Sequence, residues 1–159
     1  MSVGARIEAL LTESGVPFRS FEHAAATSAA DAARIRGTPL HIGGKSLVMK
    51  LDRGIGFAIL ALSGSRAVHN RMLRHHLRVR RYRFATLDEL MEITGLKPGS
   101  VPPFGRPIFE LPLYVDAGLA AKEQIAFGAG SRQHSIVMAT ADWLAAAKPT
   151  DVFPFSRDP

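Results

Sequence analysis

The 159-residue sequence contains no cysteine, which removes several kinds of chemistry at once. Without it the protein has no thiolate nucleophile, disulfide, iron–sulfur cluster or cysteine-ligated zinc. Long apolar runs are missing too: no segment approaches the ~20 residues of a membrane-spanning helix. The first 15 residues carry charges within a helical apolar period, unlike the unbroken apolar core of a signal peptide. We therefore expect a soluble, cytoplasmic protein.

Acidic residues are absent from residues 66–83, a stretch that contains seven arginines. It carries +7, while the other 13 basic and 14 acidic residues sum to −1, so it accounts for the net charge of +6. On a helical wheel, Arg71, Arg74 and Arg78 lie opposite an apolar face. One interpretation is a solvated helix face. We favour a surface that binds nucleic acid phosphates, with Arg80 included, because no acid competes for the guanidinium groups.

No metal site or cofactor motif is predicted. On the same wheel His69 and His76 fall on the apolar face, where a histidine is more often a hydrogen-bonded core residue than a ligand. The neighbouring His75 and His76 point in different directions on a helix. Neither pair has a carboxylate or a third histidine at a suitable spacing.

Gly44, Lys45 and Ser46 form the last three letters of a phosphate-binding P-loop, yet the motif fails. Its first glycine should stand at position 39, which is proline. A P-loop lysine also opens a helix, whereas the residues after Lys45 form a short apolar run typical of a buried strand. A nucleoside triphosphatase is therefore not expected, and Lys45 needs another explanation.

The remaining pattern predicts one compact α+β domain over residues 1–159, with a core at about 7–148, a frayed tail at 149–159 and a curved, mixed central sheet. Helices are expected at 3–14, from Thr27 or Ser28 to Gly37, at 63–77, at 86–95 with a capping box, and at 141–147. Strands are expected at 18–21, 45–51, 57–62, 79–85, 108–111, 113–115, 125–127 and 135–138. The proline- and glycine-rich stretch 96–107 is expected to be a loop.

Two glycine-containing segments could belong to a pocket or could be purely structural. The stretch 128–136, "GAGSRQHSI", is either a plain hairpin turn or a place where backbone N–H groups approach a ligand. The stretch 101–105, "VPPFG", either stiffens a connection or forms one wall of a pocket. The residue types alone leave both alternatives open.

Taken in order, several segments resemble the YbaK/ProX family of aminoacyl-tRNA deacylases, which includes the editing domain inserted in bacterial prolyl-tRNA synthetases. They are "FEHAAATSAADAA", "GGKSLVMK", the basic helix, "TGLKPGSVPPFG", "LYVDAGLA" and "IAFGAGSRQHSIVM". The resemblance covers about residues 7–143, and the long proline–glycine form of the central loop looks closer to the free-standing ProX-like members than to YbaK itself. It implies a mixed, barrel-like sheet surrounded by helices, and hydrolysis of the ester that joins a wrong amino acid to tRNA.

The resemblance also implies roles for particular residues. The essential lysine of the family falls on Lys45, which should hold the 3′-terminal phosphate or ribose and steer the ester carbonyl. The implied substrate-binding residues are Ser46, Pro102, Pro103, Phe104, Gly105, Gly128, Gly130, Ser131 and His134. No Ser-His-Asp triad is evident, so a positioned water or the substrate itself is the expected attacking group.

The sequence-based hypothesis is a hydrolase acting in trans on mischarged tRNA, with tRNA(Pro) carrying alanine, cysteine or another small residue as the favoured substrate. Its partners would be the 3′ end and acceptor stem of an aminoacyl-tRNA, and prolyl-tRNA synthetase. The main rival is a non-catalytic module that binds tRNA or another nucleic acid on the same fold. A third possibility is a pocket for a small molecule or peptide with incidental basicity.

Overall fold

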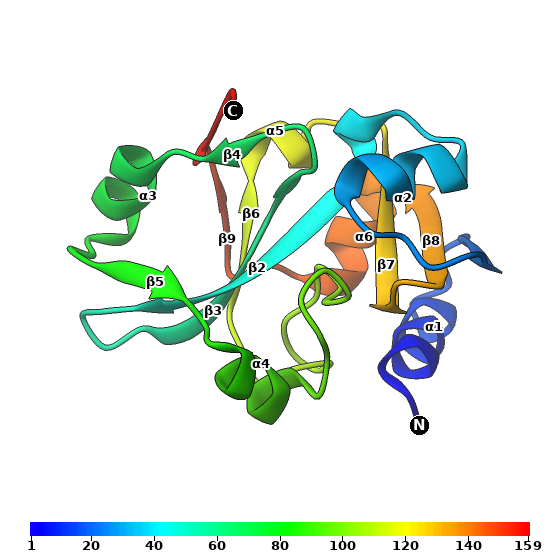
Figure 1. Ribbon diagram of the computed structural model, residues 1–159, viewed down its shortest axis with the longest axis horizontal. Helices are drawn as coiled ribbons and strands as arrows, with labels where there is room; N and C mark the ends of the chain where they lie inside the picture. Colours follow the sequence, from blue (N-terminus) through cyan, green and yellow to red (C-terminus); the bar gives the residue numbers. More distant parts are fainter.

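A computed structural model describes all 159 residues (Figure 1). The helices are α1 Val3–Glu13, α2 Ala29–Arg36, α3 Asn70–Leu77, α4 Leu87–Thr94, α5 Ala117–Ala120 and α6 Thr140–Ala147, with a 3-10 turn η1 at Leu40–Ile42. The strands are β1 Arg19–Glu22, β2 Gly44–Leu51, β3 Gly56–Ser63, β4 Ala67–Val68, β5 Tyr82–Phe84, β6 Leu113–Asp116, β7 Gln124–Ser131, β8 His134–Ala139, β9 Asp151–Phe153 and β10 Ser156–Arg157. The expected α+β class is confirmed.

The strands form three sheets. A mixed five-stranded sheet has the order β5-β2-β3-β6-β9, in which β3, β6 and β9 run parallel while β2 is antiparallel to β3 and β5. An antiparallel sheet has the order β1-β8-β7, and β10 pairs with β4. A single parallel bridge between Gly43 and Ala126 joins the two larger sheets. No closed barrel results, so the barrel-like detail of the expected fold is not confirmed.

The β2/β3 hairpin, which the apolar runs predicted, lies in the interior of the larger sheet. Residues 58–62 of β3 are completely buried, which suits a strand covered on both faces. In the register, Lys45 lies opposite Leu62, and Met49 lies opposite Ala58. The hairpin therefore holds the backbone at Lys45 on a rigid element.

Helix ends follow the local signals. The Ser28 side chain accepts from the Asp31 backbone N–H at the start of α2, and Gly37 ends that helix in a left-handed conformation. At α4 the predicted capping box is present, because Thr86 and Glu89 each accept from the other's backbone N–H. These helices needed no tertiary information to be located.

Two predicted elements are wrong. Residues 108–111 form bends and turns instead of a strand, and they follow the proline-rich loop into the core, where Ile108, Phe109 and Leu111 are buried. The helix expected at 63–77 begins only at Asn70, because Ala67 and Val68 pair with β10. His69 caps α3 by accepting from the backbone N–H of Met72 at 3.1 Å.

The frayed tail expected at 149–159 is also wrong. Residues 151–153 add a parallel strand to β6, and β10 pairs with β4. Between them Phe155 is completely buried, and its carbonyl accepts from the His69 backbone N–H at 2.7 Å. Burial of Phe153 and Phe155 together with this strand pairing ties the C-terminal segment to the sheets.

A membrane-spanning helix needs both length and an apolar composition, and none of the helices described above has the two together.

Candidate functional site

A cavity of about 270 Å³ lies where the two larger sheets meet. Its walls come from α2 and the segment before it, the first residues of β2, the β7/β8 hairpin, and the loop around Gly99 and Val101. In Figure 1 this is the end of the molecule near α2, β7 and β8, opposite to α3. The cavity thus joins segments from separate parts of the chain.

Lys45 lines this cavity from the second position of β2. Its ammonium group donates a hydrogen bond to the backbone carbonyl of Arg66, and no carboxylate lies within ion-pair distance. Desolvation by the surrounding protein lowers the pKa of Lys45. The side chain is therefore anchored by a backbone acceptor while its positive charge has no protein partner.

Ser46 lines the same cavity. Its Oγ is buried and has no hydrogen-bond partner within the protein. A buried hydroxyl without a partner costs free energy. Thr38 and Thr140 carry such hydroxyls too, but of the three only Ser46 lines the cavity, so its hydrogen-bonding capacity is unused beside the ligand space.

Only some of the predicted site residues of the β7/β8 hairpin face the cavity. Gly128 and Ser131 line the cavity, and the pairing of β7 with β8 is irregular between them. Gly130 faces the other way, packs against Val3, and has a φ of 87°. His134 also lies outside the cavity, with its Nε2 2.6 Å from the Ser20 hydroxyl.

The proline-rich loop contributes to the core more than to the cavity. Phe104 is buried and packs edge-on against Phe127, with ring centroids 5.5 Å apart. The Pro103 carbonyl accepts from the Trp143 indole N–H at 3.0 Å. Pro102 to Gly105 do not line the cavity, whereas Gly99 and Val101 of the same loop do.

Three lining residues that the sequence analysis did not name as site residues, Ser135, His23 and Arg36, form a hydrogen-bond network. Ser135 is completely buried in β8, and its Oγ lies 2.7 Å from His23 Nε2 and accepts from Arg36 Nε at 2.8 Å. The partners are 112 and 99 residues from Ser135 in sequence. No local motif signals such a network, because its members share only a position in space.

The electrostatic character of the cavity is uniform. Its charged lining residues are Arg36, Lys45 and Arg132, and no aspartate or glutamate lines it. Arg132 donates to the backbone carbonyl of Pro98 at 2.6 Å, so it also lacks a carboxylate partner. A small concave site with cations and no acid is suited to an anionic ligand.

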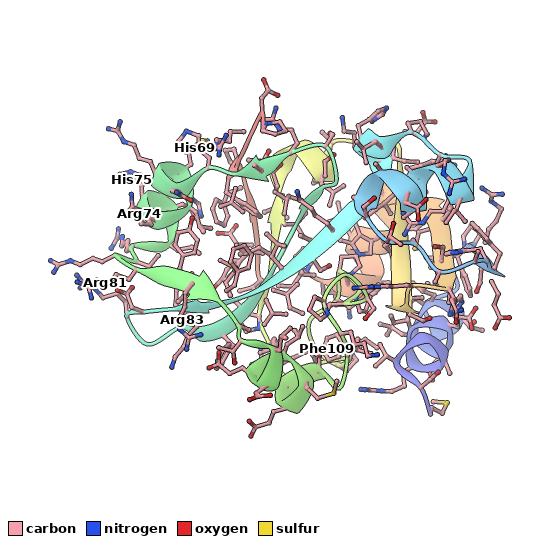
Figure 2. All side chains as sticks on the ribbon, viewed as in Figure 1. His69, Arg74, His75, Arg81, Arg83 and Phe109 are labelled. Atoms are coloured by element: carbon pink, nitrogen blue, oxygen red, sulfur yellow. The ribbon has the colours of Figure 1, made fainter.

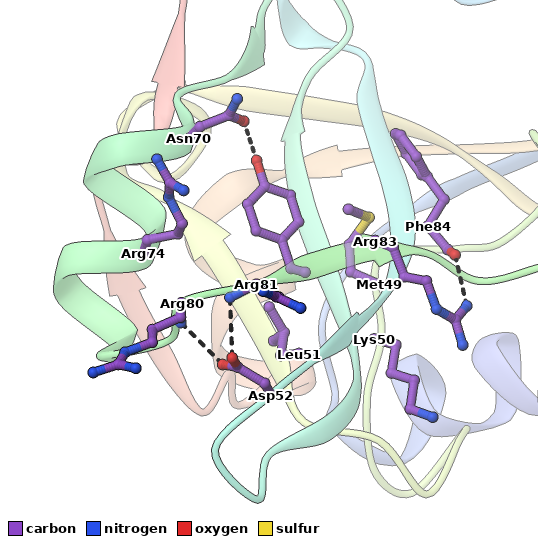
Figure 3. A pocket seen from close by; sticks show the side chains of 11 residues that line it. Met49, Lys50, Leu51, Asp52, Asn70, Arg74, Arg80, Arg81, Arg83 and Phe84 are labelled. Atoms are coloured by element: carbon purple, nitrogen blue, oxygen red, sulfur yellow. Dashed lines mark hydrogen bonds between the residues drawn. The ribbon is translucent and has the colours of Figure 1, made fainter.

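A second, open cavity of about 720 Å³ lies at the far end of β2 (Figure 3). Its lining includes Arg74 and residues 80–84, and Asp52 accepts there from the backbone N–H groups of Arg80 and Arg81. Figure 2 shows Arg74, Arg81 and Arg83 at this end of the molecule.

The arginines of the predicted binding surface are free of protein partners. Arg71, Arg74, Arg78 and Arg80 are exposed, and none of their guanidinium groups makes a hydrogen bond or ion pair within the protein. Two other arginines of the stretch are paired: Arg66 with Asp158 and Arg83 with Glu89. We call the four free residues, together with Arg81, the arginine surface.

His69 and His76 are hydrogen-bonded as expected, but they are not core residues. His69 is half-buried at the helix start. His76 is exposed, stacks on Phe153 at 3.7 Å between ring centroids, and has its Nε2 2.8 Å from Asp151. The folded-back C-terminal segment supplies both partners of His76.

Comparison with known proteins identifies the family of this chain. Residues 23–146 match the family model described as an aminoacyl-tRNA editing domain. The multifunctional Ser/Thr-tRNA deacylase ProXp-y of Escherichia coli (strain K12) is 35% identical over 148 residues, which cover 91% of this chain and 87% of that protein. The protein of the same name from Escherichia coli O157:H7 matches equally.

Two solved structures share the fold. A candidate trans-editing enzyme for prolyl tRNA synthetase aligns with a TM-score of 0.80 at 22% identity, covering 99% of this chain and 98% of the other. The hypothetical protein APE2540 aligns with a TM-score of 0.81 at 22% identity, covering 96% and 99%. At such identities these structures establish likeness of fold alone. With the match over residues 23–146 and the 35% identical relative, this chain belongs to the aminoacyl-tRNA editing domain family.

Proposed function

We propose that the protein is a trans-editing hydrolase that removes a small, wrongly attached amino acid from tRNA, with tRNA(Pro) as the favoured tRNA. That the chain is an aminoacyl-tRNA deacylase follows from its family and its curated relative. The single observation that carries the proposal is the acid-free cavity holding Lys45. Editing is needed because a synthetase pocket gains only about 1–3 kcal/mol from one methylene.

The size of the cavity supports a small substrate group. At about 270 Å³ it is slightly smaller than the ~300–1,000 Å³ of typical ligand pockets. That size suits the amino acid and the adjoining end of the tRNA but not a duplex. The E. coli relative is named as a deacylase of Ser- and Thr-tRNA. We therefore include serine and threonine, beside alanine and cysteine, among the amino acids that we propose are removed. The partnerless hydroxyl of Ser46 is a suitable contact for such a side chain.

In the proposed reaction, Lys45 directs the ester carbonyl toward the irregular part of the β7/β8 hairpin. Peptide groups at such a bulge are left out of the regular ladder, so N–H groups near Gly128 and Ser131 can stabilise the developing oxyanion. The attacking group is a positioned water, whose oxygen joins the acyl carbon while a proton passes to the leaving ribose oxygen; if a hydroxyl of the substrate attacks first, a water then hydrolyses the ester so formed. The acyl–oxygen bond breaks, releasing the free amino acid and the tRNA with its 3′-terminal hydroxyl.

The acceptor stem has a natural place on the arginine surface. Strand β2 connects the two regions, with Lys45 at one end and Leu51 in the wall of the open cavity at the other. Eight residues of strand span roughly 26 Å. A tRNA whose 3′ end enters the small cavity can therefore place duplex phosphates against Arg71, Arg74, Arg78 and Arg80. Prolyl-tRNA synthetase, which releases the mischarged substrate, is the proposed functional partner.

The decisive experiment offers a panel of aminoacyl-tRNAs to the purified protein and measures release of the amino acid. We expect Lys45→Ala to lower the rate on the best substrate by at least about 100-fold, as for loss of an oxyanion-stabilising group. Lys122→Ala is the matched control, because Lys122 lines neither cavity and makes no ion pair. Equal rates for Lys45→Ala and wild type would remove Lys45 from the mechanism.

The alternative function is a non-catalytic module that binds tRNA through the same surfaces. Both functions predict salt-dependent binding, so binding alone does not separate them. Hydrolysis does: if no member of the panel loses its amino acid faster than in buffer, the binding module becomes the better description. Equal hydrolysis of free aminoacyl esters and charged tRNA would favour a small-molecule pocket.

A further inference from the structure

Arg36, the last residue of α2, is a half-buried cation with spare hydrogen-bonding capacity. Its Nε donates to Ser135 Oγ at 2.8 Å. Its terminal nitrogens Nη1 and Nη2 donate to no acceptor in the protein, and none of the ion pairs of the molecule includes Arg36. The cation therefore sits in the wall of the cavity with its outer edge unused.

This arrangement costs free energy in the absence of a ligand. Removing a charge from water is unfavourable unless a counter-charge replaces the lost hydration. Burial lowers even the pKa of the Arg36 guanidinium. The one carboxylate on the same helix, Asp31, is paired with the exposed Arg34 at 2.6 Å. Helix α2 thus pairs its exposed arginine and leaves the half-buried one free.

A directed hydrogen-bond chain fixes the orientation of Arg36. His23 Nδ1 lies 2.7 Å from the Ala24 carbonyl, which can only accept, so Nδ1 carries the ring proton. His23 Nε2 then accepts from the Ser135 hydroxyl, and the lone pairs of Ser135 remain for Arg36 Nε. Because Ser135 is completely buried, it acts as a positioning residue and not as a nucleophile.

The outer edge of Arg36 lies beside the strand that carries Lys45. Its Nη1 is 3.8 Å from the point where a Cβ on Gly43 would stand. Gly43 and Lys45 are two residues apart on extended backbone, so their substituents point to the same side. Two cations without carboxylate partners therefore share this side of the cavity.

The chemistry of a guanidinium indicates which part of an aminoacyl-tRNA it would take. An ester carbonyl is neutral and cannot balance the buried charge, whereas a phosphodiester brings one negative charge. Two parallel N–H groups of a guanidinium also match two phosphate oxygens. Lys45, a compact point charge held by the Arg66 carbonyl, suits the single oxygen of the ester.

Building on the proposed function, we propose that Arg36 contacts the substrate directly: its guanidinium binds the phosphodiester on the 5′ side of the terminal adenosine, and Lys45 is left to contact the ester. Ser135 and His23 hold the guanidinium in place. The family resemblance assigns both the phosphate contact and the ester contact to Lys45; in this proposal Arg36 makes the first and Lys45 the second.

The test uses adenosine 5′-monophosphate and adenosine as probes of the intact protein, with binding measured by calorimetry at low salt. Wild type should bind the monophosphate at least about tenfold more tightly than adenosine, because a hydrogen bond to a charged group is among the stronger ones in proteins. Arg36→Gln should bring the two affinities together. Arg36→Lys keeps the charge but loses the two parallel N–H groups, so its preference for the monophosphate should lie between those of wild type and Arg36→Gln.

Arg34→Gln is the control, since it removes an equal charge from the same helix on the exposed side. It should leave both affinities unchanged. The proposal is overturned if wild type does not distinguish the probes, or if Arg36→Gln retains the preference for the monophosphate. Should Arg36→Gln fail to fold, Arg36→Lys decides, because an unchanged preference there excludes a guanidinium fork. Failure of every aminoacyl-tRNA to be hydrolysed would contradict the proposed function while leaving this phosphate contact standing.

Discussion

Charged residues of this protein occur in two arrangements: on the surface some form ion pairs, and in the cavity they have no oppositely charged partner. Arg83 and Glu89 form a bidentate pair at 2.7 and 3.1 Å on the surface. In the cavity, Arg36 and Lys45 have no carboxylate partners although burial lowers both pKa values. In the first arrangement the opposite charges neutralise each other, whereas the second leaves positive charge that a ligand can neutralise.

At this scale the stability should depend on pH through Glu89. The hydrogen bonds that Arg83 donates to Glu89 lower the pKa of this carboxyl from 4.5 to about 2, and the bond from the Thr86 backbone N–H is the second largest cause. A carboxyl with a depressed folded-state pKa contributes stability that is present above its unfolded pKa and lost as pH falls. Between about pH 4.5 and 2, wild type should lose stability more steeply than Glu89→Gln in urea titrations.

Glu92→Gln serves as the comparison for this pH experiment, because Glu92 lies on the same helix, is exposed, and makes no ion pair. It should follow the wild-type curve. Identical curves for wild type and Glu89→Gln would mean that the pair with Arg83 does not form in solution.

At the scale of elements, the C-terminal segment decides the stability of the larger sheet. Strand β9 extends it beside β6, and β10 holds β4 directly before α3. Phe155 lies between them, packed against Phe153 with ring centroids 5.2 Å apart. Asp116 Oδ1 accepts from the Phe155 backbone N–H at 2.8 Å. The segment therefore supports the helix that displays the arginines.

Phe155→Ala should lower the free energy of unfolding by about 3–5 kcal/mol, because it removes a completely buried ring and leaves a cavity. Denaturant unfolding followed by circular dichroism measures this directly. Phe84→Ala is the control: this ring is 63% exposed, and its loss should change stability little. Equal effects of the two substitutions would contradict the packed C-terminal segment.

At the scale of the whole molecule, unpaired positive charge gathers in two places, one at each end of β2. The small cavity holds Arg36, Lys45 and Arg132, and the arginine surface lies at the opposite end (Figures 1 and 2). Phosphate contacts by exposed arginines release counterions, so they determine how steeply binding depends on salt. The cavity should govern which ester is cleaved, and the surface should govern how tightly tRNA binds.

Changing Arg71, Arg74 and Arg78 together to glutamine should weaken tRNA binding. In a plot of the logarithm of the tRNA-binding constant against the logarithm of the salt concentration, the slope should become less steep by about 0.9 for each phosphate that the variant no longer neutralises. Filter binding over a series of salt concentrations measures both effects.

A triple glutamine variant of Arg19, Arg34 and Arg106 removes the same charge from other exposed positions. It should keep a slope close to wild type. If both triple variants behave alike, net charge rather than the arginine surface controls binding.

Local signals made part of this structure predictable. The caps of α2 and α4 depend on residues close together in sequence, so Ser28, Gly37, Thr86 and Glu89 could be assigned without the fold. The β2/β3 hairpin followed from two apolar runs around a short turn. Resemblance to a family pointed to Lys45, whose catalytic role stays a prediction although the residue does line the cavity.

The sequence by itself determined the helices with local caps, the central hairpin, the concentration of positive charge and the family. Tertiary structure alone decided that residues 108–111 are not a strand, that the C-terminal segment pairs with the sheets, and that Pro102–Gly105 lie in the core while Gly99 and Val101 line the cavity. It also decided that His23, Arg36 and Ser135 meet. The physical reason is distance along the chain: caps and turns are satisfied by neighbouring residues, whereas these contacts exist only after segments far apart in sequence have packed together.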